Sequence, residues 1–180
     1  MSRRASAFFA LAFVALIPTA NAAPAPKAIC APDAVTLEGD AAVARNLKTV
    51  QSIYAAFSTG DVPAILACIA PEARWESWAD NRAQAAGVPW LTERKAPEGV
   101  AVFFAYVGQW KVNAFAVKNV MAGGLNVAAE VEVDFDVTQT GGRIKDEEIH
   151  YWTFNERGQV TGLRHYNDTA KHIAAANGGR

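Results

Sequence analysis

The hydrophobic pattern changes its period near Lys111, and this change constrains the fold more than any other feature of the sequence. From there onward apolar and polar residues alternate, which is typical of strands with one buried face. Four strands separated by glycine-containing turns are predicted, at residues 112–121, 125–138, 143–155 and 159–169. Because the intervening turns are short, we expect antiparallel hairpins whose Val and Phe side chains face the rest of the domain.

The first part of the chain shows helical periods instead. In residues 41–58 apolar side chains recur at steps of three and four, which predicts a helix with one buried stripe. Asp61 is the predicted N-cap of a short second helix that Pro71 ends, and Pro97 lies in the first turn of a third helix. Between these helices we expect a short strand and a long loop, at residues 74–78 and 79–97. Three helices followed by a curved antiparallel sheet make an α+β fold.

The N-terminus has the parts of a secretory signal peptide. Arg3 and Arg4 precede an apolar run at residues 8–18, and Ala20-Asn-Ala22 is an Ala-x-Ala cleavage site. The run is shorter than the roughly 20 residues that span a bilayer, so cleavage is favoured over an uncleaved anchor. We therefore expect an exported protein, periplasmic or secreted, that leaves the membrane on cleavage. The expected segments are a signal peptide at 1–22, a flexible tether at 23–38, the folded domain at 39–172 and a disordered tail at 173–180.

Composition excludes nucleic acid as a partner and leaves open whether the two cysteines form a disulfide. With 17 basic and 18 acidic residues the formal net charge is −1, so the chain lacks the basic field that nucleic-acid binding needs. Cys30 and Cys68 allow a single disulfide in an oxidising compartment; alternatively, Cys68 is a buried free thiol. The three histidines show no ligand spacing, so neither a metal site nor a cofactor is expected.

Candidate chemistry gathers on the last two predicted strands. Alternation places Arg164, Tyr166 and Asp168 on one face of the last strand, and His150 and Trp152 on one face of the strand before it. If these faces coincide, an imidazole meets a carboxylate beside an indole. This pattern fits an acid/base pocket with His150 and Asp168 as its catalytic residues, and it equally fits a structural salt-bridge network.

Two neighbouring features are interpreted as structural. His165 is expected on a different face from His150, and the acidic run from Asp146 to Glu148 is expected to be a solvated shoulder of a hairpin. By contrast, Trp90 in a polar loop and Trp152 beside His150 indicate a ligand cavity with aromatic walls. The predicted pocket residues are Trp75, Trp90, Phe104, Trp152, Arg164 and Tyr166.

Three short sequence segments carry a resemblance to a known family. They are Ile53-Tyr-Ala-Ala-Phe57 followed by Gly60-Asp61, Glu98-Gly-Val-Ala-Val-Phe-Phe104, and His150-x-Trp-Thr-Phe154 followed by Arg164-x-Tyr-x-Asp168. Together with the order of the elements, they resemble the SnoaL-like branch of the nuclear transport factor 2-like superfamily over residues 46–170. The resemblance implies a cone-shaped fold whose sheet wraps the first helix and encloses a deep pocket, commonly in a homodimer.

The resemblance implies fold more strongly than activity, because the superfamily includes isomerases, cyclases, hydrolases and proteins without chemistry. The Arg-x-Asp of the epoxide hydrolase-like members is replaced by His150-Tyr-Trp152. The full set of catalytic residues of the ketosteroid isomerase-like members is not found either. A cyclase-like activity needs only one acid/base residue in an apolar pocket. We therefore expect a pocket for a small hydrophobic or aromatic molecule, with cofactor-free proton transfer as one hypothesis and an inert binding or dimeric accessory module as the other.

Overall fold

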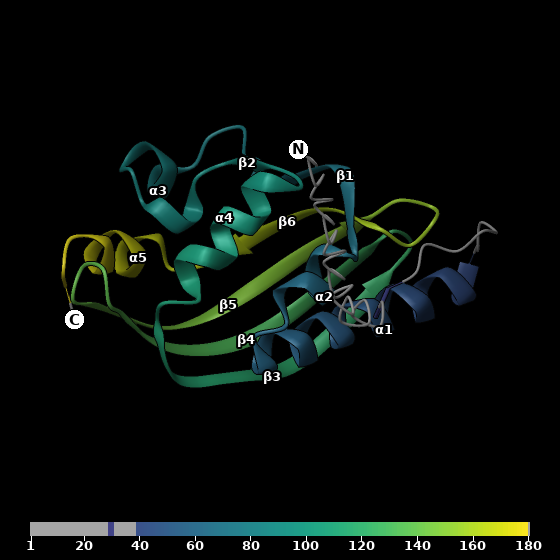
Figure 1. Ribbon diagram of the computed structural model, residues 1–180, viewed down its shortest axis with the longest axis horizontal. Helices are drawn as coiled ribbons and strands as arrows, with labels where there is room; N and C mark the ends of the chain where they lie inside the picture. Colours follow the sequence, from purple (N-terminus) through teal and green to yellow (C-terminus); the bar gives the residue numbers. More distant parts are fainter. Residues whose placement is uncertain (1–28, 31–38, 180) are drawn as a thin grey trace, which may run out of the picture.

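The computed structural model describes residues 29–30 and 39–179 (Figure 1). The expected signal peptide and most of the expected tether therefore lie outside the described residues. None of the helices in the described ranges is long and apolar enough to cross a membrane.

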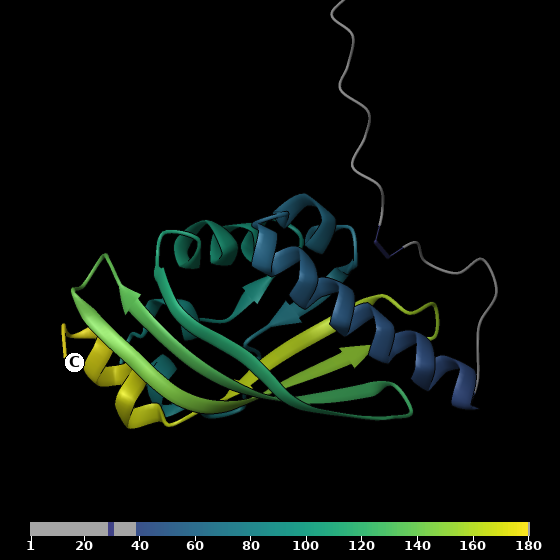
Figure 2. The same ribbon diagram turned by 90° about the horizontal axis from the view of Figure 1, so that it is seen from below.

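A curved sheet of six strands forms the body of the described chain (Figure 2). The strands are β1 (Ile69–Trp75), β2 (Arg94–Lys95), β3 (Lys111–Gly123), β4 (Asn126–Val137), β5 (Gly142–Phe154) and β6 (Val160–Tyr166). Their order across the sheet is β2-β1-β6-β5-β4-β3, and every pair is antiparallel except β1 with β6. The four strands predicted in the C-terminal half are confirmed as β3 to β6, and they pair as consecutive hairpins.

Helices cover one face of this sheet (Figure 1). The helical elements are α1 (Gly39–Thr59), α2 (Val62–Leu66), α3 (Arg82–Ala85), the 3-10 turn η1 (Pro89–Leu91), α4 (Glu98–Val107) and α5 (Thr169–Ala176). The three predicted helices correspond to α1, α2 and α4. Asp61 caps α2 as predicted, because its side chain accepts a hydrogen bond from the backbone N–H of Ala64 at 3.1 Å.

The core lies between α1, α4 and the inward face of the sheet. In β4 every second residue is buried, which matches the predicted alternation of acidic residues with Val and Phe. Val50 and Ile53 of α1 and Phe103 and Phe104 of α4 are buried against this face. The helices thus close an apolar interior against the inward face of the sheet.

The first strand differs from the prediction. β1 begins at Ile69 and includes Pro71, where the sequence analysis placed the end of the second helix. The pairing of β1 with β6 is irregular between Ile69 and Arg74, so the missing N–H of Pro71 interrupts no regular ladder. The long segment that follows β1 holds α3, η1 and β2 rather than a plain loop.

The C-terminus also corrects the prediction. The last strand ends at Tyr166, and Asp168 is the N-cap of α5, with its carboxylate accepting from the N–H groups of Ala170 and Lys171. Residues 173–179 are therefore not a disordered tail: α5 continues to Ala176, and the carbonyl of Gly179 accepts from the N–H of Arg143 at 2.9 Å.

Cys30 and Cys68 are joined by a disulfide, with their Cα atoms 4.9 Å apart. Of the two readings that the sequence left open, the bridge is the one found. Cys68 lies two residues after the end of α2 and is only 1% exposed, so the bond ties Cys30 to the core.

Candidate functional site

A cavity of about 90 Å³ lies between the helices and the inward face of the sheet. Its walls are predominantly aromatic and aliphatic, and four of the five tryptophans border it: Trp75, Trp90, Trp110 and Trp152. The volume is small beside the roughly 300–1,000 Å³ of pockets that hold drug-sized ligands. Such a space suits a small, mainly apolar molecule.

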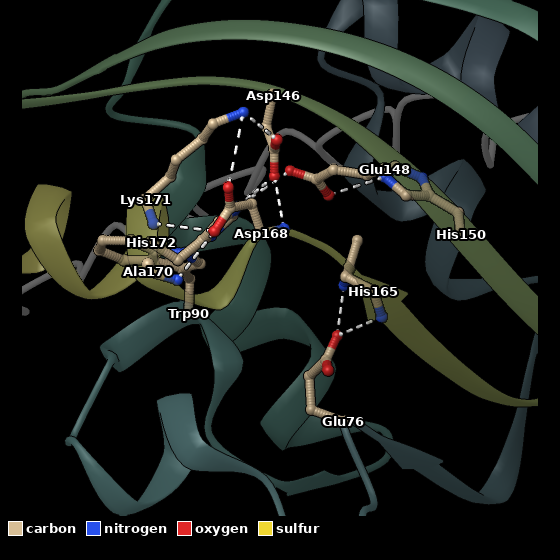
Figure 3. A network of polar contacts seen from close by, with 10 residues as sticks. All are labelled: Glu76, Trp90, Asp146, Glu148, His150, His165, Asp168, Ala170, Lys171 and His172. Atoms are coloured by element: carbon tan, nitrogen blue, oxygen red, sulfur yellow. Dashed lines mark hydrogen bonds and ion pairs between the residues drawn. The ribbon is translucent and has the colours of Figure 1, made fainter.

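Polar groups reach the cavity from one strip of the sheet and from α1 and α5. The strip is the inward face of β5, where alternation buries Asp146, Glu148 and His150 in succession, and the last two line the cavity. His165 joins them from β6, since it is the direct ladder partner of His150. Tyr54 from α1 and His172 from α5 complete the polar lining. Figure 3 shows the carboxylates and histidines of this network.

His150 is held at both ring nitrogens. Its Nδ1 lies 3.0 Å from the Tyr54 hydroxyl, and its Nε2 lies 3.4 Å from a carboxylate oxygen of Glu148. The Tyr54 hydroxyl also accepts a hydrogen bond from Trp152 Nε1 at 3.2 Å, so its own proton points to His150 Nδ1. Burial and the nearby charge of His165 lower the pKa of His150, and they outweigh the opposing effect of Glu148. Because the Tyr54 proton is directed at Nδ1, the proton of a neutral His150 lies on Nε2 and faces Glu148.

His165 has the opposite electrostatic setting. Glu76, directly after β1, is fully buried and has a positive φ of 54°. Its carboxylate receives the backbone N–H of His165 at 3.2 Å, the indole N–H of Trp78 at 2.9 Å and the Nδ1 of His165. Burial acts to lower the pKa of His165, but the charge and hydrogen bond of Glu76 raise it above its usual value. The described residues provide no hydrogen-bond partner for the Nε2 of His165, and the residue borders the cavity.

A third histidine lies in a cluster beside the first two. The Nε2 of His172 is 3.1 Å from Glu148 and 3.6 Å from Asp146, and Lys171 Nζ lies 2.7 Å from Asp146. Burial acts to lower the pKa of His172, but its hydrogen bonds to the two carboxylates raise it to about 9. Burial likewise opposes ionisation of Asp146, yet hydrogen bonds from His172 and Lys171 lower its pKa to about 2.

One contact conflicts with a charge on His172. The indole N–H of Trp90 donates to His172 Nδ1 at 2.8 Å, which an imidazolium cannot accept because both of its nitrogens carry protons. In the conformation shown, His172 is therefore the neutral Nε2–H tautomer. Protonation, which the two carboxylates favour, requires the Trp90 hydrogen bond to break.

Asp146, Glu148 and His172 offer three ligand atoms within 4.8 Å of one another, the arrangement of a candidate metal centre. The residues do not fit a metal in this conformation. With Trp90 donating to Nδ1, the proton of His172 sits on Nε2, the nitrogen that faces the carboxylates. Lys171 already supplies a positive charge to Asp146. The cluster is better described as a closed hydrogen-bond network.

The structure separates the predicted catalytic pair. Asp168 caps α5, and its backbone N–H donates to Asp146 at 2.8 Å; the carboxylate that meets His150 is Glu148. The expectation that His165 lies on a different face from His150 is also wrong, since their rings are 4.4 Å apart. The acidic run is not a solvated shoulder, because Asp146 and Glu148 are each only 6% exposed.

The predicted pocket residues divide into two groups. Trp75, Trp90, Phe104 and Trp152 border the cavity, and their contact with a ligand stays a prediction. Arg164 and Tyr166 belong to the outer face of β6: Tyr166 is 46% exposed, and Arg164 Nε donates to the carbonyl of Ser77 at 2.6 Å. Alternation grouped these two correctly, but the inward face of β6 is that of His165.

Comparisons with known proteins agree with this fold. The model of the SnoaL-like domain family matches residues 50–163. A search of curated proteins finds no significant match. Among solved structures, a nuclear transport factor 2-like protein from Burkholderia xenovorans is 20% identical, with a TM-score of 0.60, and the match covers 75% of this chain and 98% of that one.

Two further structures carry functional names. A putative polyketide cyclase from Silicibacter is 18% identical with a TM-score of 0.55, covering 72% of this chain and 93% of that one. A putative isomerase from Rhodopseudomonas palustris is 16% identical with a TM-score of 0.57, covering 74% of this chain and 96% of that one. At these identities the likeness shows the fold alone.

Proposed function

The chain belongs to the SnoaL-like domain family, and from that premise we propose that its cavity binds a small hydrophobic or aromatic molecule and moves a proton on it without a cofactor. The observation that carries the proposal is the pair of adjacent histidines whose pKa values are shifted in opposite directions beside one apolar cavity. Neighbouring titratable groups with diverging pKa values are typical of a base and an acid that work together.

The two histidines divide the roles. Glu148 faces Nε2 of His150, which leaves Nδ1 to accept a proton through the Tyr54 hydroxyl. A proton leaving a carbon next to a carbonyl passes to the Tyr54 oxygen as the tyrosine proton moves to His150 Nδ1. Burial raises the pKa of Tyr54, so a concerted transfer that forms no tyrosinate is favoured. The Nε2–H of His165 stabilises the enolate oxygen, and return of the proton to another carbon completes an isomerisation.

The names of the similar structures support this reaction class, since one is called a putative polyketide cyclase and another a putative isomerase. The role that the sequence analysis gave to Asp168 passes to Glu148. Arg164 and Tyr166 have no part in the proposal, because they lie on the outer face of the sheet.

Binding is tested first, by titrating the protein with 1-indanone while tryptophan emission is recorded. Because four indoles border the cavity, a bound aromatic ketone is expected to change the emission saturably. A linear, unsaturable response would contradict binding in this cavity.

Proton transfer is tested with the same compound in D₂O, by following deuterium uptake at its α-carbon by NMR. Wild-type protein is expected to accelerate the exchange. His150→Gln is expected to abolish the acceleration while the dissociation constant stays within about tenfold, or about 1.4 kcal/mol. Asp168→Asn is the matched control, because Asp168 itself is not among the residues that line the cavity, and this variant is expected to leave the exchange intact.

One observation favours the alternative of an inert binding module. Both ring nitrogens of His150 already contact protein groups, Tyr54 at one and Glu148 at the other. A closed pair of this kind also serves as a structural network. Saturable binding of 1-indanone without any accelerated exchange would select this alternative.

Export and dimerisation remain part of the proposal. The Cys30–Cys68 disulfide is compatible with an oxidising, extracellular or periplasmic compartment. Mass spectrometry of protein from the native host is expected to find Ala23 at the N-terminus, and an intact Met1 would contradict cleavage.

The homodimer is supported by exposed apolar side chains on the edge strand β3, namely Val112, Val117 and Met121. Sedimentation velocity tests whether the protein is a dimer in solution.

A further inference from the structure

A second hollow lies on the outer face of the sheet, where β5 and β6 run beside the end of β1. Its volume is about 300 Å³. The ladder pairs Thr153 with Gly162 and Tyr151 with Arg164 border it, and they alternate along the strands with the pairs that face the cavity. The hollow and the cavity therefore lie on opposite faces of the sheet, and the proposed function uses none of the polar groups of the hollow.

The floor of the hollow is formed by a glycine and two neighbouring hydroxyl groups. A Cβ on Gly162 would come within 2.9 Å of Thr153 Oγ1 and 3.0 Å of the carbonyl oxygen of Arg74, so this position has no room for a side chain. A bulge in the pairing of β5 with β6 leaves Thr161 as an extra residue beside Gly162. The hydroxyls of Thr153 and Thr161 lie 3.2 Å apart, so the bulge brings a second hydroxyl to this face.

Arg164 brings a positive charge that no carboxylate of the described residues neutralises. Its Nε donates to the carbonyl of Ser77 at 2.6 Å, and its Cζ lies 5.4 Å from the centre of the Trp78 ring. These contacts orient the guanidinium and leave its Nη1 and Nη2 without a partner in the described chain. The other arginine that borders the hollow, Arg74, is paired with Glu93. The hollow is thus positively charged through Arg164.

These groups select a particular ligand chemistry. A planar guanidinium with two free nitrogens fits a carboxylate, which it binds through two parallel N–H···O hydrogen bonds. One unpaired positive charge matches a monoanion better than a phosphate monoester, whose charge near pH 7 is about −1.5 to −2. The hydroxyls of Tyr151, Thr153 and Thr161 offer donors and lone pairs to the hydroxyl groups of a ligand.

We propose that this hollow is a second ligand site, which binds a small polyhydroxylated carboxylate of the sugar-acid class. The carboxylate pairs with Nη1 and Nη2 of Arg164, and the ligand hydroxyls bind those of Thr153 and Thr161. The site is independent of the proposed function because it lies on the other face of the sheet. It also gives a role to Arg164, which the sequence pattern singles out and the cavity does not use.

The experiment compares D-glucuronate with D-glucose, which has the same ring with a hydroxymethyl group in place of the carboxylate. The backbone N–H signals of Thr161 and Gly162 are followed by NMR while each compound is added to ¹⁵N-labelled protein. D-glucuronate is expected to shift both signals saturably and to bind about tenfold more tightly than D-glucose, a difference of about 1.4 kcal/mol. Equal affinity for the two compounds, or the lack of a saturable shift, would overturn the proposal.

A pair of variants tests the assignment of Arg164. Arg164→Gln is expected to weaken the binding of D-glucuronate about tenfold and to leave D-glucose unchanged. The matched control is Arg157→Gln, which removes the same charge from an exposed turn and is not among the residues that border the hollow. This control is expected to bind like the wild type. Equal weakening in both variants would mean that net charge alone attracts the anion, and it would overturn the proposed contact.

Two further titrations use only the wild type, so they do not depend on the folding of a variant. Saturating the cavity with 1-indanone is expected to leave the affinity for D-glucuronate unchanged, because the sheet separates the two sites. Competition between the two compounds would contradict a separate site. Inorganic phosphate is expected to bind more weakly than D-glucuronate, and equal or tighter binding of phosphate would overturn the proposed ligand class.

Discussion

His150 and His165 lie directly opposite each other in the β5–β6 ladder, with ring centroids 4.4 Å apart and ring planes at 80°. Glu76 is the carboxylate partner of His165, whereas His150 shares Glu148 with His172. Because two adjacent imidazolium ions repel each other, protonation of one ring disfavours protonation of the other. Against the effect of burial, Glu76 raises the pKa of His165, whereas burial and the charge of His165 lower the pKa of His150, so His165 is the ring that protonation favours.

The first prediction tests this coupling. Glu76→Gln removes the anion that stabilises the charged form of His165, so the pKa of His165 is expected to fall. Once His165 is neutral, its charge no longer opposes protonation of His150, and this effect outweighs the smaller direct loss of the Glu76 charge, so the pKa of His150 is expected to rise. NMR titration of the ring Cε1–H signals measures both values. Asp168→Asn is expected to leave both unchanged, and an unaltered His150 midpoint in Glu76→Gln would refute the coupling.

The second prediction concerns Trp90 and His172. The indole N–H of Trp90 donates to Nδ1 and so stabilises the neutral ring. In Trp90→Phe this donor is absent, and the pKa of His172 is expected to rise relative to that of the wild type. Trp110→Phe serves as the control, because Trp110 packs on Trp90 at 5.1 Å and has no ring contact or hydrogen bond with His172. A fall of the His172 midpoint in Trp90→Phe would mean that Nδ1 is not an acceptor.

Local periodicity predicts much of this fold. The alternation of residues 130–137 reappears in the burial of β4, and the stripe of α4 is buried at Val100, Phe103, Phe104 and Val107. Both are properties of a residue and its near neighbours. The parallel pairing of β1 with β6 and the irregularity at Pro71 depend on distant segments, and the local pattern carries no signal for them.

The residues of the site likewise divide into those that local periodicity places and those that depend on distant segments. Extending the period-two count backward from His150 places Glu148 and Asp146 on the same inward face, so this part of the network was within reach of the sequence. The sequence could not predict which face of β6 points inward. Alternation groups Arg164 with Tyr166 but does not say whether their face or the opposite one faces the core. Glu76 and Tyr54 reach the histidines through tertiary packing alone, from β1 and α1.

The third prediction is a dependence of stability on acidity. The folded-state pKa of Asp146 is about 2, below its ordinary value of 3.8, so its carboxylate stabilises the fold above about pH 4. This contribution, roughly 2 kcal/mol, is lost as the pH falls through 2. Urea unfolding at pH 6 and pH 2 is expected to show a smaller loss in Asp146→Asn than in wild type. The matched control is Glu147→Gln, on the exposed face of β5, which is expected to behave like wild type.

The fourth prediction concerns the disulfide. The bond closes a loop with a sequence separation of 38 residues, which restricts the unfolded chain by roughly 4 kcal/mol in the chain-entropy account. Cys30→Ala is expected to lower the free energy of unfolding by about this amount, while the buried Cys68 stays in place. In reductant, wild type and variant are expected to unfold at the same urea concentration. Equal midpoints without reductant, or unlinked peptides of Cys30 and Cys68 in non-reducing digests, would show that the bridge is absent in solution.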